Sequence, residues 1–421
     1  MRRSLVLVMA AGLMVSVVPG QMAEAAPRKP AKRWDFNGDG RADLVVGAPS
    51  VKVGGTRGAG GVYVYRGTGK PVLITRATPG VPGGPGFTQE FGKSFVSHDF
   101  NGDGYADLAV TFGNGSGGSA EGIVLLFGSK KGLTGKGSRV LPGTLAMAAG
   151  DFDHDGRGDL AVYAKSGSAV TLYSKGLTST RELRTGKRGF GYALAAGDVS
   201  GDGVDDLIAA TPDIWTGEDG GSDGGPPRIQ HAQLTVFSGT RIWHKTIGDG
   251  SIRHIAAADL TGDGKAEVVY NGYFANTFVQ ISKGGRFAPK PVVIKRTGTD
   301  LTLGDATGDG RADLALGYLP VNTDRGGRVY FYPGTKKGVG KARVIRRPGQ
   351  PRSDAFGRSV HLINITGDRR ADLVIGLPRD RKGNGSVLVL PAAKPTSSRF
   401  LHPTASGFAL YGESVSGHLP V

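Results

Sequence analysis

The strongest constraint on this chain is one acidic nine-residue pattern that occurs seven times, with small departures in its fifth and seventh copies. The pattern reads Asp-x-(Asn/Asp/Ser/Thr)-x-Asp-Gly-x-x-Asp, and an apolar stretch follows each copy. The copies span 35–43, 99–107, 151–159, 198–206, 259–267, 305–313 and 364–372, and we call them loops 1 to 7 in that order. Their average spacing of about 55 residues is close to the length of a propeller blade. Such a repeat predicts small units that become stable by stacking on their neighbours.

Each repeat has the pattern of a small antiparallel sheet. The apolar stretches after the loops predict strands at 44–46, 108–110, 160–162, 207–209, 268–270, 314–316 and 373–375. A second strand is predicted after a glycine-rich turn, at 62–65, 124–127, 170–173, 234–237, 278–281, 329–332 and 387–390. A short strand precedes most loops, as at 91–95, 190–194 and 356–362. Glycine accounts for 72 of the 421 residues, which favours tight turns and disfavours long helices.

These units predict an all-β chain that folds as a seven-bladed β-propeller with calcium-binding loops, over residues 26–421. The last residues suggest how the ring closes, because Tyr411–Val415 align with Phe91–Phe95 and His418 aligns with His98. We therefore expect a C-terminal strand at about 408–418 to complete the first blade. An open solenoid is the alternative, although it leaves the half-repeat at the end unexplained.

The loops are predicted to bind calcium, because positions 1, 3, 5 and 9 gather hard oxygen atoms and the position-7 carbonyl can complete the shell. The predicted ligands are Asp35, Asn37, Asp39, Arg41, Asp43, Asp99, Asn101, Asp103, Tyr105, Asp107, Asp151, Asp153, Asp155, Arg157, Asp159, Asp198, Ser200, Asp202, Val204, Asp206, Asp259, Thr261, Asp263, Lys265, Glu267, Asp305, Thr307, Asp309, Arg311 and Asp313. An EF-hand is excluded because position 12 is never Glu. An Asp-Gly turn without metal remains the alternative for a single copy. Whether loop 7 binds metal stays open, since Asn364 and Arg369 replace a carboxylate and the turn glycine.

Aromatic-glycine pairs precede several loops: Phe91-Gly92, Phe190-Gly191, Phe356-Gly357 and Tyr411-Gly412. With the acidic loops and Gly47-Ala48-Pro49, they make the repeats resemble FG-GAP repeats, the blade units of the integrin α-subunit head and of bacterial relatives. The resemblance implies a seven-bladed propeller with calcium loops on one face and ligands on the other. The pair is missing before loops 3, 5 and 6. Because the resemblance covers only the propeller repeats of integrins, it implies no integrin-type signalling.

The first 25 residues read as a secretory signal peptide, with Arg2 and Arg3 before an apolar stretch and a small-residue site at Ala23–Ala25. No second apolar stretch of spanning length follows. We therefore expect a secreted, extracellular protein without a membrane span in the mature chain. Cysteine is absent, which excludes disulfides, zinc–thiolate sites and cysteine nucleophiles.

The net charge of +16 favours an anionic partner, but the basic residues are scattered and no nucleic-acid target is expected. Ligand-face candidates lie in the longest insertion, 212–231, and are Asp213, Trp215, Glu218 and Asp219. The sequence predicts a monomeric binding or adhesion module for an extracellular protein or glycan. The alternative is a polysaccharide lyase or hydrolase, which is less favoured because no acid–base pair is evident. The Arg-Gly-Asp tripeptide at 157–159 lies inside loop 3, where Asp159 is a predicted ligand.

Overall fold

The structure is a computed structural model. It describes residues 31–67, 69–113, 120–143, 146–163, 169–184, 193–214, 229–247, 252–272, 276–320, 326–347, 349, 354–392, 395–404 and 410–415. The predicted signal peptide lies outside these residues. None of the helices in the described ranges is long and apolar enough to span a membrane.

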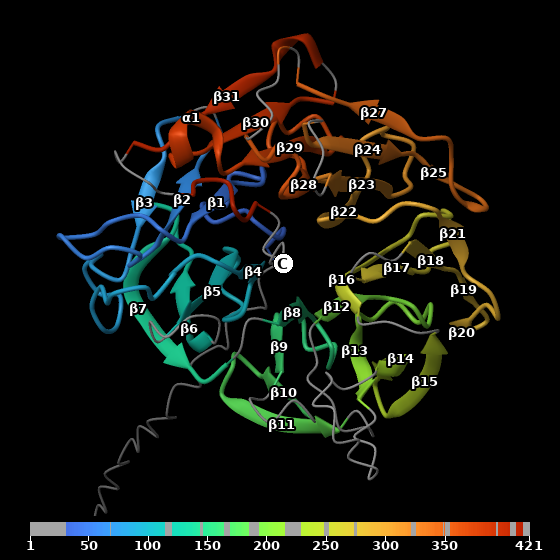
Figure 1. Ribbon diagram of the computed structural model, residues 1–421. Coiled ribbons are helices and arrows are strands. Elements are labelled where there is room, and N and C mark those ends of the chain that lie inside the picture. Colours follow the sequence, from blue (N-terminus) through green and yellow to red (C-terminus); the bar gives the residue numbers. More distant parts are fainter. Residues whose placement is uncertain are drawn as a thin grey trace, which may run out of the picture.

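Seven antiparallel sheets are arranged in a ring (Figure 1). Blade 1 contains β1 (Leu44–Ala48), β2 (Gly61–Tyr65) and β3 (Val72–Ile74). Blade 2 contains β4 (Phe95–His98), β5 (Asp107–Gly113), β6 (Ala120–Phe127) and β7 (Thr134–Leu141). Blade 3 contains β8 (Met147–Gly150), β9 (Asp159–Tyr163), β10 (Ala169–Ser174) and β11 (Ser179–Arg184). Blade 4 contains β12 (Ala193–Gly197), β13 (Asp206–Ile214), β14 (Ile229–Ser238) and β15 (Arg241–Ile247).

The other three blades repeat this order. Blade 5 contains β16 (Ile252–Ala258), β17 (Glu267–Gly272), β18 (Thr277–Gln280) and β21 (Val292–Ile294). Blade 6 contains β22 (Asp300–Gly304), β23 (Asp313–Tyr318), β24 (Arg328–Tyr332) and β27 (Arg343–Ile345). Blade 7 contains β28 (Val360–Ile363), β29 (Asp372–Leu377), β30 (Ser386–Leu390) and β31 (Arg399–Leu401). Two small hairpins, a short turn and one 3-10 turn complete the fold: β19 (Ser282–Lys283) with β20 (Arg286–Phe287), β25 (Gly334–Thr335) with β26 (Gly338–Val339), α1 (Asp380–Gly383) and η1 (Pro395–Ser397).

The hydrophobic core lies between the blades rather than inside any one of them. Along β1, Val45 faces blade 2, whereas Leu44 and Val46 face blade 7. Both faces of a blade are therefore apolar, because side chains alternate across a strand and each sheet packs on two neighbours. One buried cluster occupies each of the seven junctions between adjacent blades. The all-β, seven-bladed prediction is confirmed.

The pairs Phe91-Gly92 and Phe356-Gly357 form turns, so the strands predicted at 91–95 and 356–362 begin too early. The inner strands start at Phe95 in β4 and at Val360 in β28. Gly92 and Gly357 have φ of +89° and +83°, which a strand residue does not adopt. Phe91 lies in the turn before β4, and its side chain is fully buried. Residues 190–192 of the strand predicted at 190–194 lie outside the described residues, and Ala193 begins β12.

The described C-terminal residues 410–415 lie against β1. The Gly412 N–H donates to the Gly47 carbonyl at 3.0 Å, and the Gly47 N–H donates to the Ser414 carbonyl at 2.8 Å. Tyr411 is fully buried, and its hydroxyl contacts that of Tyr65. Residues 92–94 make the same two bonds with the second strand of blade 2. Of the strand expected at about 408–418, residues 410–415 are described, and they form a turn with one bridge from Tyr411 to Gly385 instead of a regular strand. Residues 408–409 and 416–418 lie outside the described part of the chain.

The N-terminal segment enters the middle of the ring, which the sequence did not indicate. Trp34 packs edge-on against Phe95 and His361, at ring-centroid distances of 6.1 and 5.4 Å. A cavity of about 450 Å³ lies beside this segment and is lined by the inner strands of blades 2 to 7. Small side chains such as Ala149, Ala195 and Ala257 form much of its wall.

Candidate metal centre

All seven acidic loops lie on one face of the ring. Loops 2 to 7 each connect the innermost strand of a blade to its second strand, as loop 2 connects β4 to β5. Loop 1 leads into β1 in the same way. Because the strands are antiparallel, the connections between second and third strands, such as 378–385 between β29 and β30, lie on the opposite face. In blade 1, β1 takes the place of the second strand, so the connection 49–60 between β1 and β2 also lies there.

The position-1 carboxylate organises the turn in loops 1 to 6. In loop 2, Asp99 accepts the backbone N–H groups of Gly102, Asp103 and Gly104 at 2.8, 3.2 and 2.9 Å. Loops 1, 4, 5 and 6 repeat this arrangement. The φ values of +74° and +85° at Gly102 and Gly104 explain the glycines at these positions.

The position-9 carboxylate is buried at the start of the next strand. Asp107 is fully buried, and its two oxygens accept the N–H groups of Phe100 at 2.9 Å and Gly128 at 2.8 Å. Burial, reinforced by the neighbouring carboxylates, raises the pKa of Asp107 to about 8. The same causes raise the pKa of Asp43 and of Asp159 to about 7, and burial does so for Glu267. A bound cation would offset this penalty by favouring the charged forms.

Loop 3 fits a hard cation by its own geometry. One carboxylate oxygen from each of Asp151, Asp153 and Asp159 lies within 4.8 Å of the others. Asp159 is fully buried, and its Oδ1 atom has no hydrogen-bond partner. An unpaired buried carboxylate oxygen is costly, and calcium prefers a group of oxygens of this kind. The donor set of loop 3 therefore fits calcium.

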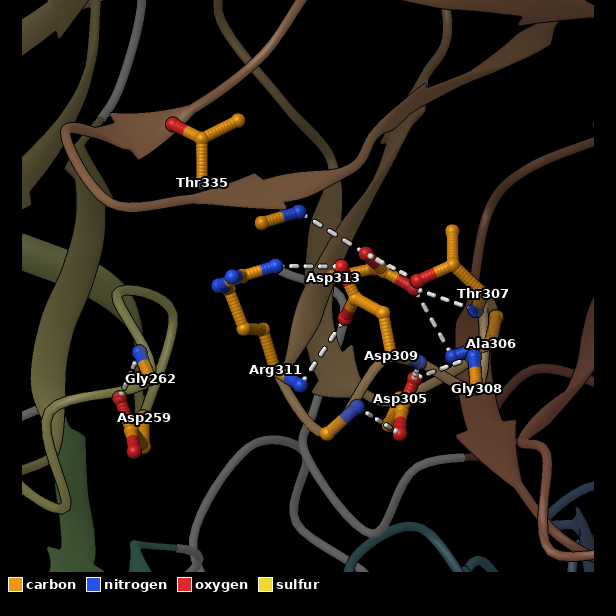
Figure 2. Close-up of polar contacts among 12 residues, drawn as sticks. Asp259, Gly262, Asp305, Ala306, Thr307, Gly308, Asp309, Arg311, Asp313 and Thr335 are labelled. Carbon is orange, nitrogen blue, oxygen red and sulfur yellow. Dashed lines mark hydrogen bonds and ion pairs between the residues drawn. The ribbon is translucent and has the colours of Figure 1, made fainter.

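Figure 2 shows loop 6 with part of loop 5 beside it. Asp305 accepts the N–H groups of Gly308, Asp309 and Gly310, and Asp313 accepts those of Ala306, Thr307 and Gly334, at distances between 2.6 and 3.2 Å. The backbone N–H of Arg311 lowers the pKa of Asp309, and the ion pair of Asp309 with the Arg311 side chain at 2.6 Å lowers it further. In loop 5 the buried Thr261 Oγ1 has no hydrogen-bond partner.

Loop 7 keeps the shape of the other loops with fewer charges. Asn364 Oδ1 accepts the Gly367 N–H at 2.7 Å, as the position-1 carboxylate does elsewhere. Arg369 stands where the other loops have glycine and has φ of +72°. Asp372 Oδ1 already accepts the Ala392 N–H at 3.1 Å. This loop retains the turn but offers two carboxylates, Asp368 and Asp372.

Neighbouring loops are joined by hydrogen bonds that the sequence did not reveal. The position-8 N–H of one loop donates to the position-1 carbonyl of the preceding loop, at 2.6–2.9 Å. The pairs are Ala106 with Asp35, Gly158 with Asp99, Ala266 with Asp198, Ala312 with Asp259, and Ala371 with Asp305. A small residue at position 8 in every loop but loop 4 was the available signal.

A second contact joins the loops through side chains. The position-7 side chain lies over the position-4 glycine of the preceding loop, as Arg311 lies over Gly262 and Arg41 over Gly367. A Cβ atom on Gly262 would lie 3.1 Å from Arg311 Nε. Loop 3 has His154 at position 4, and the next loop has the short Val204 at position 7.

The ligand-face candidates predicted from the sequence fall on the edge of the described part of the chain or outside it. Asp213 lies in β13, but its side chain and the residues Trp215, Glu218 and Asp219 lie outside the described part of the chain. The Arg-Gly-Asp tripeptide is built into loop 3: Arg157 lies against Gly102, and Asp159 is fully buried.

Comparison with known proteins supports the repeat assignment. The sequence profile of the FG-GAP-like repeat family matches residues 35–110 and 99–162. Phosphatidylinositol-glycan-specific phospholipase D of Mus musculus is 24% identical over 379 residues, which cover 82% of this chain and 42% of that protein. Integrin alpha-IIb of Mus musculus is 34% identical over 157 residues, which cover 33% of this chain and 15% of that protein. The chain therefore spans less than half the length of both relatives.

Among solved structures, the crystal structure of BBS1N in complex with ARL6DN aligns with a TM-score of 0.45 and 16% identity, covering 71% of this chain and 77% of that chain. The profile matches within residues 35–162, the integrin alpha similarity and the ring of seven blades together support the assignment of the repeats as FG-GAP-like blades of a β-propeller.

Proposed function

We propose that this chain is an exported binding module whose propeller is stabilised by calcium in loops 1 to 6. In this proposal the face opposite the loops binds an anionic extracellular glycan or protein. The signal-peptide pattern at 1–25 supports export. The similarity to integrin alpha subunits supports a binding role for the propeller, but it does not indicate a particular ligand.

The calcium role is carried by the buried, unpartnered Oδ1 atom of Asp159 beside Asp151 and Asp153. A carboxylate oxygen in this position is destabilising unless a cation or donor reaches it. At ~1 mM free calcium, a site with a Kd of ~0.1 mM stabilises the fold by roughly 1.4 kcal/mol. Several such sites offer a chain without disulfides a substitute for covalent cross-links.

The proposed ligand face carries exposed basic side chains on two adjacent blades. Lys52 and Arg57 lie in the connection between β1 and β2, and both are exposed. Arg379, Arg381 and Lys382 lie in the connection between β29 and β30 of blade 7 and are also exposed. A surface of this charge attracts anionic polymers and fits the net charge of the chain.

Two of these basic residues are held in a costly backbone conformation. Arg381 and Lys382 in α1 have φ of +52° and +61°, and neither is glycine. The left-handed region costs about 1–2 kcal/mol for such residues. Strain of this kind concentrates at binding sites. We therefore assign Arg381 and Lys382 to the centre of the basic surface.

The assignment is tested with a sulfated polysaccharide such as heparin as a probe. The variant Arg381→Glu/Lys382→Glu is compared with Arg181→Glu/Arg241→Glu, which makes the same charge change on the exposed outer strands β11 and β15. We expect at least a tenfold loss of affinity in the first variant and less than a threefold loss in the control, at about 0.15 M salt. Equal losses, or no binding of heparin by the unmodified chain, contradict the assignment.

Catalysis is the alternative function, and the phospholipase D relative gives it a second candidate substrate. Within the described residues, the one cluster of three or more His, Asp or Glu side chains with metal-binding spacing is loop 3 itself. Turnover assays on polysaccharides and on glycosylated phosphatidylinositol test this alternative. Product release from either would replace binding as the main function.

A further inference from the structure

The bonds between neighbouring loops divide the ring into two sets. Backbone bonds from position 8 to position 1 join loops 1, 2 and 3, and a second series joins loops 4, 5, 6 and 7. In the described part of the chain, no such bond joins loop 3 to loop 4 or loop 7 to loop 1. We call loops 1 to 3 the first arc and loops 4 to 7 the second arc.

Both interruptions coincide with the N-terminal segment. At the junction of loops 3 and 4, position 8 is Asp205, whose Oδ2 atom pairs with Arg33 at 2.8 Å and accepts the Asp151 N–H at 3.4 Å. At the junction of loops 7 and 1, Trp34 packs edge-on against His361 of the inner strand of blade 7, at a ring-centroid distance of 5.4 Å. Residues 33 and 34 therefore contact the ring at both places where the series of bonds is interrupted.

The two arcs also differ in their ligand chemistry at position 3. The first arc has Asn37, Asn101 and Asp153, which offer amide or carboxylate oxygens. The second arc has hydroxyl groups at this position, in Ser200, Thr261, Thr307 and Thr366. Carboxylate and amide oxygens are standard calcium ligands, and a higher ligand charge tightens a site. This difference favours tighter binding in the first arc.

Position 5 adds a second difference. In loops 5 and 6 the position-5 carboxylate already pairs with the position-7 cation: Asp263 with Lys265 at 3.8 Å, and Asp309 with Arg311 at 2.6 Å (Figure 2). A calcium ion must displace or share these partners. Loop 3 stands at the other extreme, because it gathers four aspartates and the Oδ1 atom of Asp159 has no partner.

We propose that the ring binds calcium in two classes, with a tight and mutually coupled set in loops 1 to 3 and a weaker set in loops 4 to 6. Within an arc, an ion that fixes the position-1 side chain also fixes the carbonyl that accepts the next loop's position-8 N–H. That N–H lies directly before the position-9 ligand, so one ion orders part of the neighbouring site. The inference rests on the calcium role proposed above, and it adds the order in which calcium ions occupy the loops.

The test is calcium binding to the metal-free mature chain, measured by equilibrium dialysis and calorimetry. We expect about three ions in a first phase and the remainder at a Kd at least tenfold higher, a gap of about 1.4 kcal/mol. A single class of sites overturns the inference and leaves the calcium role intact. No calcium binding at all overturns both.

Two alanine variants at exposed ligand positions, one in each arc, separate the arcs. Asp153→Ala is expected to remove one ion from the first phase, to weaken the other two at least threefold, and to leave the second phase unchanged. Asp309→Ala is expected to remove one ion from the second phase and to leave the first unchanged. Equal effects of the two variants on the first phase contradict the division into arcs.

A variant that gains calcium affinity distinguishes a change in the site from a folding defect, because a misfolded chain does not bind calcium more tightly. Thr307→Asp gives loop 6 the position-3 ligand of loop 3, and we expect its ion to bind at least threefold tighter. The melting temperature in saturating calcium serves as the folding control for every variant. Unchanged or weaker binding in Thr307→Asp contradicts the role assigned to position 3.

Discussion

Asp153 and Asp159 bring carboxylate oxygens within 4.8 Å of each other in loop 3, while the Oδ1 atom of the buried Asp159 has no hydrogen-bond partner. Two negative charges at this distance repel each other, and burial strengthens the repulsion. The loop is therefore a source of instability without a cation and a source of stability with one. This relationship underlies the first two predictions.

The calcium-free protein is expected to lose stability as the pH rises from about 5 to about 8. The pKa values of Asp43, Asp107 and Asp159 are raised to about 7, 8 and 7 by burial and neighbouring carboxylates. Between the ordinary aspartate pKa and these values the folded chain holds more protons than the unfolded chain, so the free energy of unfolding falls with rising pH. Calorimetry of the metal-free chain across this range measures the effect. A stability that rises over the same range would contradict it.

Asp159→Asn is expected to stabilise the calcium-free protein at pH 8 by about 2–4 kcal/mol, because the amide keeps the shape and removes a buried charge. The same variant should respond less to added calcium. Asp202→Asn, at an exposed position-5 site in loop 4, is the control and should change the calcium-free stability by less than about 0.5 kcal/mol. Urea unfolding with and without calcium compares them. Equal effects of both variants would show that burial of Asp159 is not the cause.

Position 4 of the loops gives two substitutions with opposite signs. Gly262 has φ of +75° and lies under Arg311, so Gly262→Ala should cost about 1–2 kcal/mol. His154 has φ of +58° without being glycine, so His154→Gly should stabilise the protein by up to about 1 kcal/mol. Thermal unfolding in saturating calcium measures both. A stabilising alanine at 262 would show that the turn tolerates a side chain there.

Closure of the ring depends on the C-terminal residues. Tyr411 is fully buried between blades 7 and 1, where its ring packs edge-on against Tyr63 at 5.2 Å. Tyr411→Ala should cost about 3–5 kcal/mol through the cavity that it leaves. Tyr411→Phe loses only the contact with the Tyr65 hydroxyl and should cost about 1 kcal/mol. Similar small losses in both variants, measured by urea unfolding, would mean that these residues do not close the ring.

The blades could be predicted from the sequence because the acidic loops repeat and because both faces of each strand are apolar. Val45 and Val46 are typical, since they are adjacent in sequence and both buried on opposite faces of β1. The local run of apolar residues is therefore enough to predict a strand that is buried on both faces. The position-1 and position-9 aspartates of the loops could be found in the same way.

What the sequence could not show depends on contacts between distant residues. Arg33 and Asp205 are 172 positions apart, and no local pattern pairs them. The position of Trp34 inside the ring and the hydrogen bonds between neighbouring loops also depend on contacts between residues that are far apart in the sequence. The phenylalanine-glycine pairs were assigned to strands because their residues suit strands, whereas the positive φ at Gly92 appears only when the chain turns between blades.

The central claim is that calcium in the acidic loops holds the ring of blades together. Calorimetry of the mature chain after chelation and again in millimolar calcium, with elemental analysis of the same samples, tests it most directly. The account predicts bound calcium and a melting temperature that rises with calcium and much less with magnesium, whose octahedral preference suits these loops poorly. No bound metal and an unchanged melting temperature would contradict it.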